Sequence, residues 1–125
     1  MQLTLEQPDS SFVLRGTGPG RVLVNQRTLT RSFIVSADRL LEDWPPGAPA
    51  ELEPGHMDAA LDLGIEVLVL GTGDRLRFPS QAVMAACLTR GVGIEVMDNA
   101  AAARTFNVLV GEGRRAAAAF LIERA

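Results

Sequence analysis

From Ile65 onward, three short apolar runs alternate with two segments of helical character, and this alternation constrains the fold more than any other feature. The runs span residues 65–70, 93–97 and 114–122. The first is almost unbroken, which is typical of a strand covered on both faces. The last fits a helix or a strand on propensity alone, and Gly113 with the preceding strands favours a strand. The order indicates right-handed crossover units on a largely parallel sheet.

Turn and capping residues set the limits of the two helices. Ser80 can cap a helix that closes at Gly91, and residues 98–99 can cap another over about 100–111. A short β-like piece, residues 75–78, precedes the first of them. The helices therefore begin directly after the segments that leave the predicted strands.

The N-terminal half has a different character. Three short β-prone runs lie at residues 13–14, 22–24 and 28–35. With the glycine-rich turn at 16–20 they predict a hairpin or meander. Residues 39–44 are expected to continue as a helical turn, after which four prolines break regular structure. A short helix follows around residues 57–61.

Together these elements predict an α/β fold. We expect one domain over residues 1–125, built in three layers around a central mixed, largely parallel sheet with an N-terminal β-hairpin extension. Hydrophobic residues make up 47% of the chain and charged residues 22%, which supplies both a core and a solvated surface.

Charge and cysteine content bear on partners and compartment. The net charge is −3, which argues against a general nucleic-acid binder. No stretch supplies the roughly 20 apolar residues of a membrane span, and the first residues do not resemble a secretion signal. The single cysteine, Cys87, cannot form an internal disulfide. We therefore expect a cytoplasmic protein without membrane insertion.

No catalytic constellation is recognisable. His56 is the only histidine and has no clustered ligands, so neither a metal site nor a histidine-based triad is expected. Gly71-Thr72-Gly73 matches only the beginning of a dinucleotide-binding loop, because Leu76 occupies the place of the third glycine. No cofactor is expected.

The carboxyl edge of the predicted sheet is the best candidate site, because open α/β sheets bind ligands there. If the strands ending at Leu70 and Met97 are neighbours, their loops share one rim. The residues then expected around a single cleft are Gly71, Thr72, Gly73, Asp98, Asn99, Arg104 and Asn107. The alternative is structural: Asp98 and Asn99 only cap a helix, and Arg104 ties down Asp98 or a carbonyl group.

Several motifs taken together also resemble a known family. They are Gly71-Thr72-Gly73, residues 93–98, residues 104–109, Glu112-Gly113-Arg114 and the alanine run to Ile122. The combination is similar to a domain of unknown function shared by bacterial and archaeal proteins, an adipogenesis-associated protein and mitochondrial complex I assembly factor 3. The resemblance implies a three-layer α/β fold with a hairpin extension. It also implies protein partners, since the mitochondrial members are assembly factors, and bacterial relatives are associated with protein-export genes.

One departure from that family concerns its chemistry. Many relatives have threonine where this chain has Asn99, and cysteine where it has Ala103. Thiol chemistry at that position is therefore impossible here. The leading hypothesis is a non-enzymatic binding or assembly module for a protein partner. The alternative is a small-ligand protein or enzyme in which Arg104 and Asn107 orient an anionic group in the same cleft.

Overall fold

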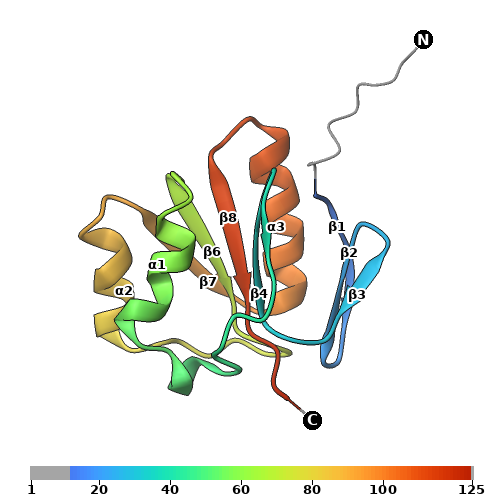
Figure 1. The fold of residues 1–125 in the computed structure, drawn as a ribbon, viewed down its shortest axis with the longest axis horizontal. Coiled ribbons are helices and arrows are strands. Elements are labelled where there is room, and N and C mark those ends of the chain that lie inside the picture. Colours follow the sequence, from blue (N-terminus) through green and yellow to red (C-terminus); the bar gives the residue numbers. More distant parts are fainter. Residues whose placement is uncertain (1–11, 125) are drawn as a thin grey trace.

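A computed structural model describes residues 12–124 and shows a central sheet of five strands in the order β5-β4-β8-β6-β7 (Figure 1). The strands are β4 (Phe33–Ser36), β5 (Leu40–Leu41), β6 (Val67–Gly71), β7 (Gly93–Met97) and β8 (Ala116–Phe120). Strand β6 pairs in parallel with both β7 and β8, whereas β4 is antiparallel to β8 and β5. The sheet is therefore mixed, with its parallel part formed by the C-terminal half of the chain.

A second, smaller sheet forms the N-terminal extension. It has three antiparallel strands, β1 (Leu14–Gly18), β2 (Arg21–Val24) and β3 (Arg27–Leu29). The turn between β1 and β2 contains Gly20, which has a φ of +67° that glycine adopts without strain. Figure 1 shows this sheet beside α3 (Asn99–Gly111), the helix that it contacts through β1.

Helices cover both faces of the central sheet. On one face lie α1 (Asp58–Leu61), α2 (Gln81–Leu88) and the 3-10 turns η2 (Pro49–Glu51) and η3 (Pro54–Met57). On the other face lie α3 and the small sheet. The molecule thus has three layers, which confirms the predicted fold class.

Alternation along the central strands supplies both cores. Leu68 and Leu70 of β6 pack toward α1 and α2, whereas Val69 packs toward α3. Strand β8 follows the same rule, with Ala117 and Ala119 on the first side and Ala118 on the second. Because every residue of β6 and β8 is buried, these two strands read in the sequence as continuous apolar runs.

Two local predictions were wrong. The helical turn expected at residues 39–44 is replaced by β5, because Leu40 and Leu41 pair with β4 through a tight turn at residues 36–39. The β-like piece at residues 75–78 forms no strand, since it leaves the sheet at the carboxyl edge and pairs with none of the strands in residues 12–124. The three-stranded N-terminal sheet extends the predicted hairpin.

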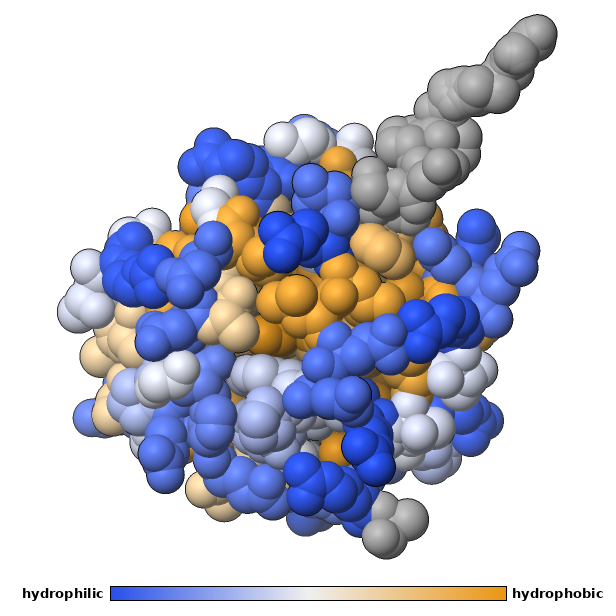
Figure 2. Space-filling model, in the orientation of Figure 1, coloured by the Kyte–Doolittle hydropathy of each residue, from blue (hydrophilic) through white to orange (hydrophobic). Residues whose placement is uncertain are grey.

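On the face that carries β4 and β5, hydrophobic residues gather at the centre and hydrophilic residues surround them (Figure 2). Leu40 and Leu41 at this edge are only partly buried. Within residues 12–124, no helix is long and apolar enough to cross a membrane.

Candidate functional site

Strands β6, β7 and β8 end at a common rim, because both neighbours of β6 are parallel to it. Gly71, the last residue of β6, is in register with Met97 of β7 and Phe120 of β8. Backbone bonds continue past the strand ends: the Thr72 N–H donates to the Met97 carbonyl, and the Leu121 N–H donates to the Gly71 carbonyl, both at 2.9 Å. Three loops therefore leave the sheet side by side.

Asn99 binds these loops to one another. It is the first residue of α3 and is 7% exposed. Its side-chain oxygen accepts from the Gly73 N–H at 3.0 Å, and its side-chain nitrogen donates to the Leu121 carbonyl at 3.1 Å. Its own N–H donates to the Gly73 carbonyl at 2.8 Å. One amide therefore fixes the loops that follow β6 and β8 against the start of α3.

This close approach explains the glycines of the first loop. A Cβ atom on Gly71 would collide with the Asn99 side-chain oxygen and would lie 3.1 Å from the Phe120 ring. Gly73 has a φ of +106°, which other residues adopt only with strain. Both glycines are thus required by packing and backbone geometry.

Thr72 organises the loop beyond them. Its side chain is fully buried, and its hydroxyl donates to the Arg75 carbonyl at 2.7 Å and accepts from the Arg77 N–H at 3.1 Å. Residues 74–78 are therefore held as a fixed segment, which we call the ridge. Buried hydrogen bonds of this kind hold a loop without contributions from its exposed side chains.

The ridge presents different side chains in alternation. Arg75 and Arg77 line a cleft, while Leu76 and Phe78 do not. Leu76 is 51% exposed and Phe78 is 66% exposed. The ridge therefore presents two arginines to the cleft and leaves two apolar side chains exposed outside it.

Arg77 forms the wall of the cleft nearest the sheet. Its Nη2 donates to the Thr72 carbonyl at 3.3 Å and approaches a Glu123 carboxylate oxygen at 3.3 Å. Its Nε is buried and has no hydrogen-bond partner among residues 12–124. The guanidinium is thus anchored at one end and unsatisfied at another.

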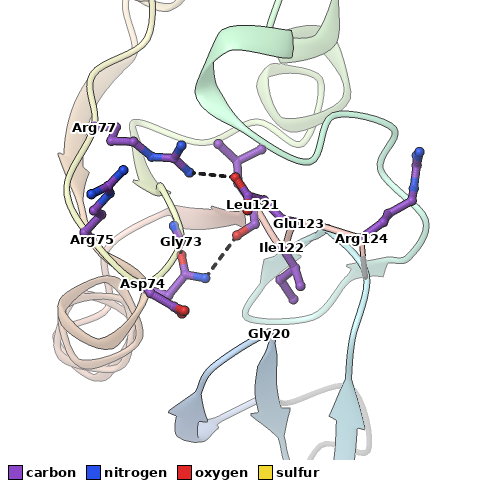
Figure 3. Close-up of a pocket in the computed structure, with 10 residues that line it drawn as sticks. Gly20, Gly73, Asp74, Arg75, Arg77, Leu121, Ile122, Glu123 and Arg124 are labelled. Carbon is purple, nitrogen blue, oxygen red and sulfur yellow. Dashed lines mark hydrogen bonds and ion pairs between the residues drawn. The ribbon is translucent and has the colours of Figure 1, made fainter.

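Two clefts meet at this edge. The arginine cleft encloses about 440 Å³ and is lined by Gly20, Gly73, Asp74, Arg75, Arg77, Asn99, Leu121, Ile122, Glu123 and Arg124. Figure 3 shows Arg75 and Arg77 on one side, the chain after β8 on the other, and Gly20 of the small sheet beyond them. The hairpin cleft encloses about 280 Å³ and is lined by Thr17, Gly18, Pro19, Gly73, Asp74, Asp98, Asn99 and Ala100.

The structure brings together five of the seven residues singled out in the sequence. Gly73 and Asn99 line both clefts, Asp98 lines the hairpin cleft, and Gly71 and Thr72 support their floor. Asp98 also caps α3, because a side-chain oxygen accepts from the Ala101 N–H at 2.8 Å.

Arg104 and Asn107 lie elsewhere. Arg104 is exposed on α3 and lines neither cleft. The Asn107 side chain accepts from the Leu14 N–H at 3.1 Å and donates to the Leu14 carbonyl at 2.7 Å. Its amide thus completes the hydrogen bonding of β1 and ties the small sheet to α3.

Sequence reasoning missed the residues that give the clefts their walls. Arg75, Arg77, Glu123 and Arg124 come from segments interpreted as strand or strand end, and the turn at 18–20 arrives from the other half of the chain. The alternation Arg-Leu-Arg-Phe after a glycine turn was the available signal for the ridge.

Titratable groups with displaced pKa values lie away from these clefts. The Arg115 backbone N–H lowers the pKa of Glu66, and the Arg114 guanidinium acts in the same direction. Burial raises the pKa of the Cys87 thiol against the opposing charge of Arg90. Among the residues described, no group of three or more His, Cys, Asp or Glu side chains is placed to hold a metal ion.

Comparison with known sequences identifies relatives over most of the chain. The family described as "Protein of unknown function (DUF498/DUF598)" matches residues 14–121. The chain is 46% identical over 104 residues to NADH dehydrogenase [ubiquinone] 1 alpha subcomplex assembly factor 3 of Xenopus tropicalis, covering 74% of this chain and 57% of that protein. The human factor of the same name is 31% identical, with 74% and 56% covered. The chain thus spans little more than half the length of these relatives.

Solved structures share the whole fold. A Xanthomonas campestris protein solved by NMR is 51% identical, with a TM-score of 0.84 and 98% of this chain and 92% of that chain covered. A Bordetella parapertussis crystal structure is 32% identical, with a TM-score of 0.85 and coverage of 94% and 100%. A related Bordetella pertussis structure, 27% identical with a TM-score of 0.80 and coverage of 98% and 93%, is described as a Mth938-like domain.

Proposed function

The chain belongs to the DUF498/DUF598 family, and from this membership and the geometry of its carboxyl edge we propose that it is a cytoplasmic, non-enzymatic module that binds a protein partner through the ridge. The assembly factors among its relatives bear names that refer to a multisubunit enzyme, which supports a protein as the ligand class. From these relatives we take only the kind of ligand, a protein, and not its identity.

The exposure of Leu76 and Phe78 carries the proposal. Both side chains leave more than half of their surface in solvent while lying two residues apart on one loop. Solvated apolar side chains that gather in one place mark interaction sites more often than isolated ones do. Aromatic residues and arginines dominate binding energy at protein interfaces, and the ridge presents both types.

The rigidity of the ridge adds to this argument. Thr72 fixes its backbone from below, and Asn99 fixes the loop that leads into it. A segment already held in place loses little conformational freedom on binding, so more of its contact energy appears as affinity. We therefore expect the partner to engage the ridge without rearranging it.

A small anionic ligand is the second candidate. The arginine cleft, at about 440 Å³, lies within the range of small-molecule sites, and Arg75, Arg77 and Arg124 line it. In this case Leu76 and Phe78 would be dispensable for binding. The two candidates therefore differ in which side of the ridge matters.

Photo-crosslinking tests the leading proposal. The photoreactive residue p-benzoyl-phenylalanine replaces Phe78 in one variant and Val108 in a control, because Val108 is 57% exposed on α3, on the other face of the sheet. We expect a discrete cross-linked protein from position 78 and none of the same mass from position 108. The captured protein is then purified and its affinity measured by calorimetry.

The calorimetric comparison decides the outcome. Leu76→Ser and Phe78→Ser are each expected to weaken the purified complex about tenfold or more, as loss of a buried apolar contact does at an interface. Val108→Ser should change the affinity less than about twofold. Equal affinities for all three variants, or identical cross-links from both positions, would refute recognition by the ridge.

A further inference from the structure

Leu76 and Phe78 are sequence neighbours of the two arginines that line the arginine cleft, so a ligand that contacts either of them comes within reach of that cleft. Arg75 and Arg77 alternate with these two residues along the ridge. A bound peptide that crosses the ridge therefore meets an apolar surface and a cationic one within a few residues of its own length.

The charges of the cleft do not balance among themselves. Arg77 approaches Glu123 at 3.3 Å, but Arg75 has no side-chain partner among residues 12–124. Arg124, on the opposite wall, donates to the Pro45 carbonyl at 3.1 Å and has no carboxylate partner within the same range. The cleft is lined by two acids, of which Glu123 is already paired with Arg77, so only the charge of Asp74 remains to offset Arg75 and Arg124. The excess is positive although the whole chain carries −3.

The way in which Arg77 is held also favours an anionic ligand. Its Nε is buried, so a ligand in the cleft would meet the terminal guanidinium nitrogens of this partly exposed side chain. Nη2 is held by the Thr72 carbonyl and Glu123, so the guanidinium is positioned at the wall of the cleft rather than free in solvent. A carboxylate entering the cleft offers this guanidinium a strong alternative acceptor.

Resting on the proposed function, we propose that the partner segment carries a carboxylate that enters the arginine cleft between Arg75 and Arg77. A neighbouring apolar residue of the same segment packs on Leu76 or Phe78. Guanidinium groups match the planar geometry of a carboxylate, which makes an acidic side chain or a terminal carboxylate the appropriate ligand. The partner is thus recognised through an acidic residue adjacent to an apolar one.

Selection from a random heptapeptide phage library on the full chain tests this inference. Selected peptides are synthesised with a fluorescein label, and their dissociation constants are measured by anisotropy. Each peptide is made with its acidic residue intact, replaced by the matching amide, and replaced by phosphoserine. We expect every enriched family to contain Asp or Glu, and the amide version to bind about tenfold more weakly or worse.

Charge reversal provides the matched comparison. Arg75→Glu should weaken the acidic peptide by about tenfold or more, whereas Arg39→Glu should change binding less than about twofold. Arg39 is an exposed arginine in the β4–β5 turn, at the opposite end of the sheet, and introduces the same change in net charge. Raising the salt concentration from about 50 to about 500 mM should weaken wild-type binding.

The outcomes separate this inference from the proposed function. Peptides that lose binding with Phe78→Ser but are indifferent to Arg75→Glu and to the amide replacement would leave protein binding intact and refute carboxylate recognition. Tighter binding of the phosphoserine peptide would assign the cleft to phosphate instead. If no peptide is enriched and position 78 yields no cross-link, both proposals fail.

Discussion

Replacing Asn99 by alanine tests whether one buried amide holds the carboxyl edge together. The substitution removes two side-chain hydrogen bonds, to the Gly73 N–H and the Leu121 carbonyl. Each bond contributes about 1 kcal/mol, and the Leu121 carbonyl, left unpaired in a buried position, adds about 1 kcal/mol or more. Alanine returns roughly 0.5 kcal/mol through its higher helix propensity. The expected net loss is about 2–3 kcal/mol.

Urea unfolding followed by the fluorescence of Trp44 measures this loss. Trp44 is the only tryptophan and is 6% exposed, so its emission reports on the core. Gln81→Ala is the control, because Gln81 also opens a helix but is exposed and has no side-chain hydrogen bond to any of residues 12–124. A loss below about 0.5 kcal/mol for Asn99→Ala, or an equal loss for Gln81→Ala, would refute the role assigned to the amide.

Three more substitutions or labelling experiments probe packing, charge and burial in turn. Gly71→Ala should destabilise the fold by about 1–3 kcal/mol in the same urea assay, because the added Cβ overpacks the edge. Gly16→Ala is the control and should be nearly neutral, since no atom lies within 4 Å of its added Cβ. Equal effects of the two substitutions would contradict the packing argument. Glu66, whose pKa is lowered mainly by the Arg115 N–H, adds stability above its ordinary pKa that is lost as the pH falls through its lower folded value. Glu66→Gln should therefore unfold more easily than wild type at neutral pH, and the difference should shrink as the pH falls below the ordinary pKa of glutamate. A difference independent of pH would refute this reasoning. The Cys87 thiol, buried and with a raised pKa, should react with a thiol-specific dye only on unfolding, and rapid labelling of the native protein would contradict its burial.

Local signals were sufficient for the C-terminal half of the fold. The strand expected at residues 93–97 matches β7, and the apolar run at 65–70 contains most of β6. The capping roles of Ser80 and Asp98 are present as side-chain hydrogen bonds to Val83 and Ala101. These features depend on residues within a few positions of one another, which is why the sequence reveals them.

Long-range contacts were not accessible in the same way. The sequence does not show that Asn107 pairs with Leu14, because 93 residues separate them. Nor does it show that the turn containing Gly20 lines a cleft with Arg124. Strand order therefore predicts that the loops after β6 and β7 share one edge, as they do, but the walls of the clefts there depend on how the small sheet docks against α3.

Strand β8 shows tertiary context overriding propensity. Four consecutive alanines, residues 116–119, favour a helix by intrinsic preference. They form a fully buried strand between β4 and β6 instead. Their backbone groups pair with both neighbouring strands, and their small side chains fit under the layers that cover the two faces of the sheet. Gly113 and the preceding strands therefore indicated the correct structure where composition did not.

At the carboxyl edge, the residues that hold the loops in place differ from those that we propose contact a partner. Thr72 and Asn99 are buried, and the hydrogen bonds that they make from their side chains run to backbone groups. Arg75, Leu76 and Phe78 are exposed, and the Arg75 guanidinium forms no hydrogen bond or ion pair within residues 12–124. Replacing all three exposed residues by serine should therefore change the unfolding free energy by less than about 1 kcal/mol, because surface substitutions away from such networks are nearly neutral. The same variant should lose both the cross-linked partner and the acidic peptide, and a large loss of stability would show that recognition and folding are not separable at this edge.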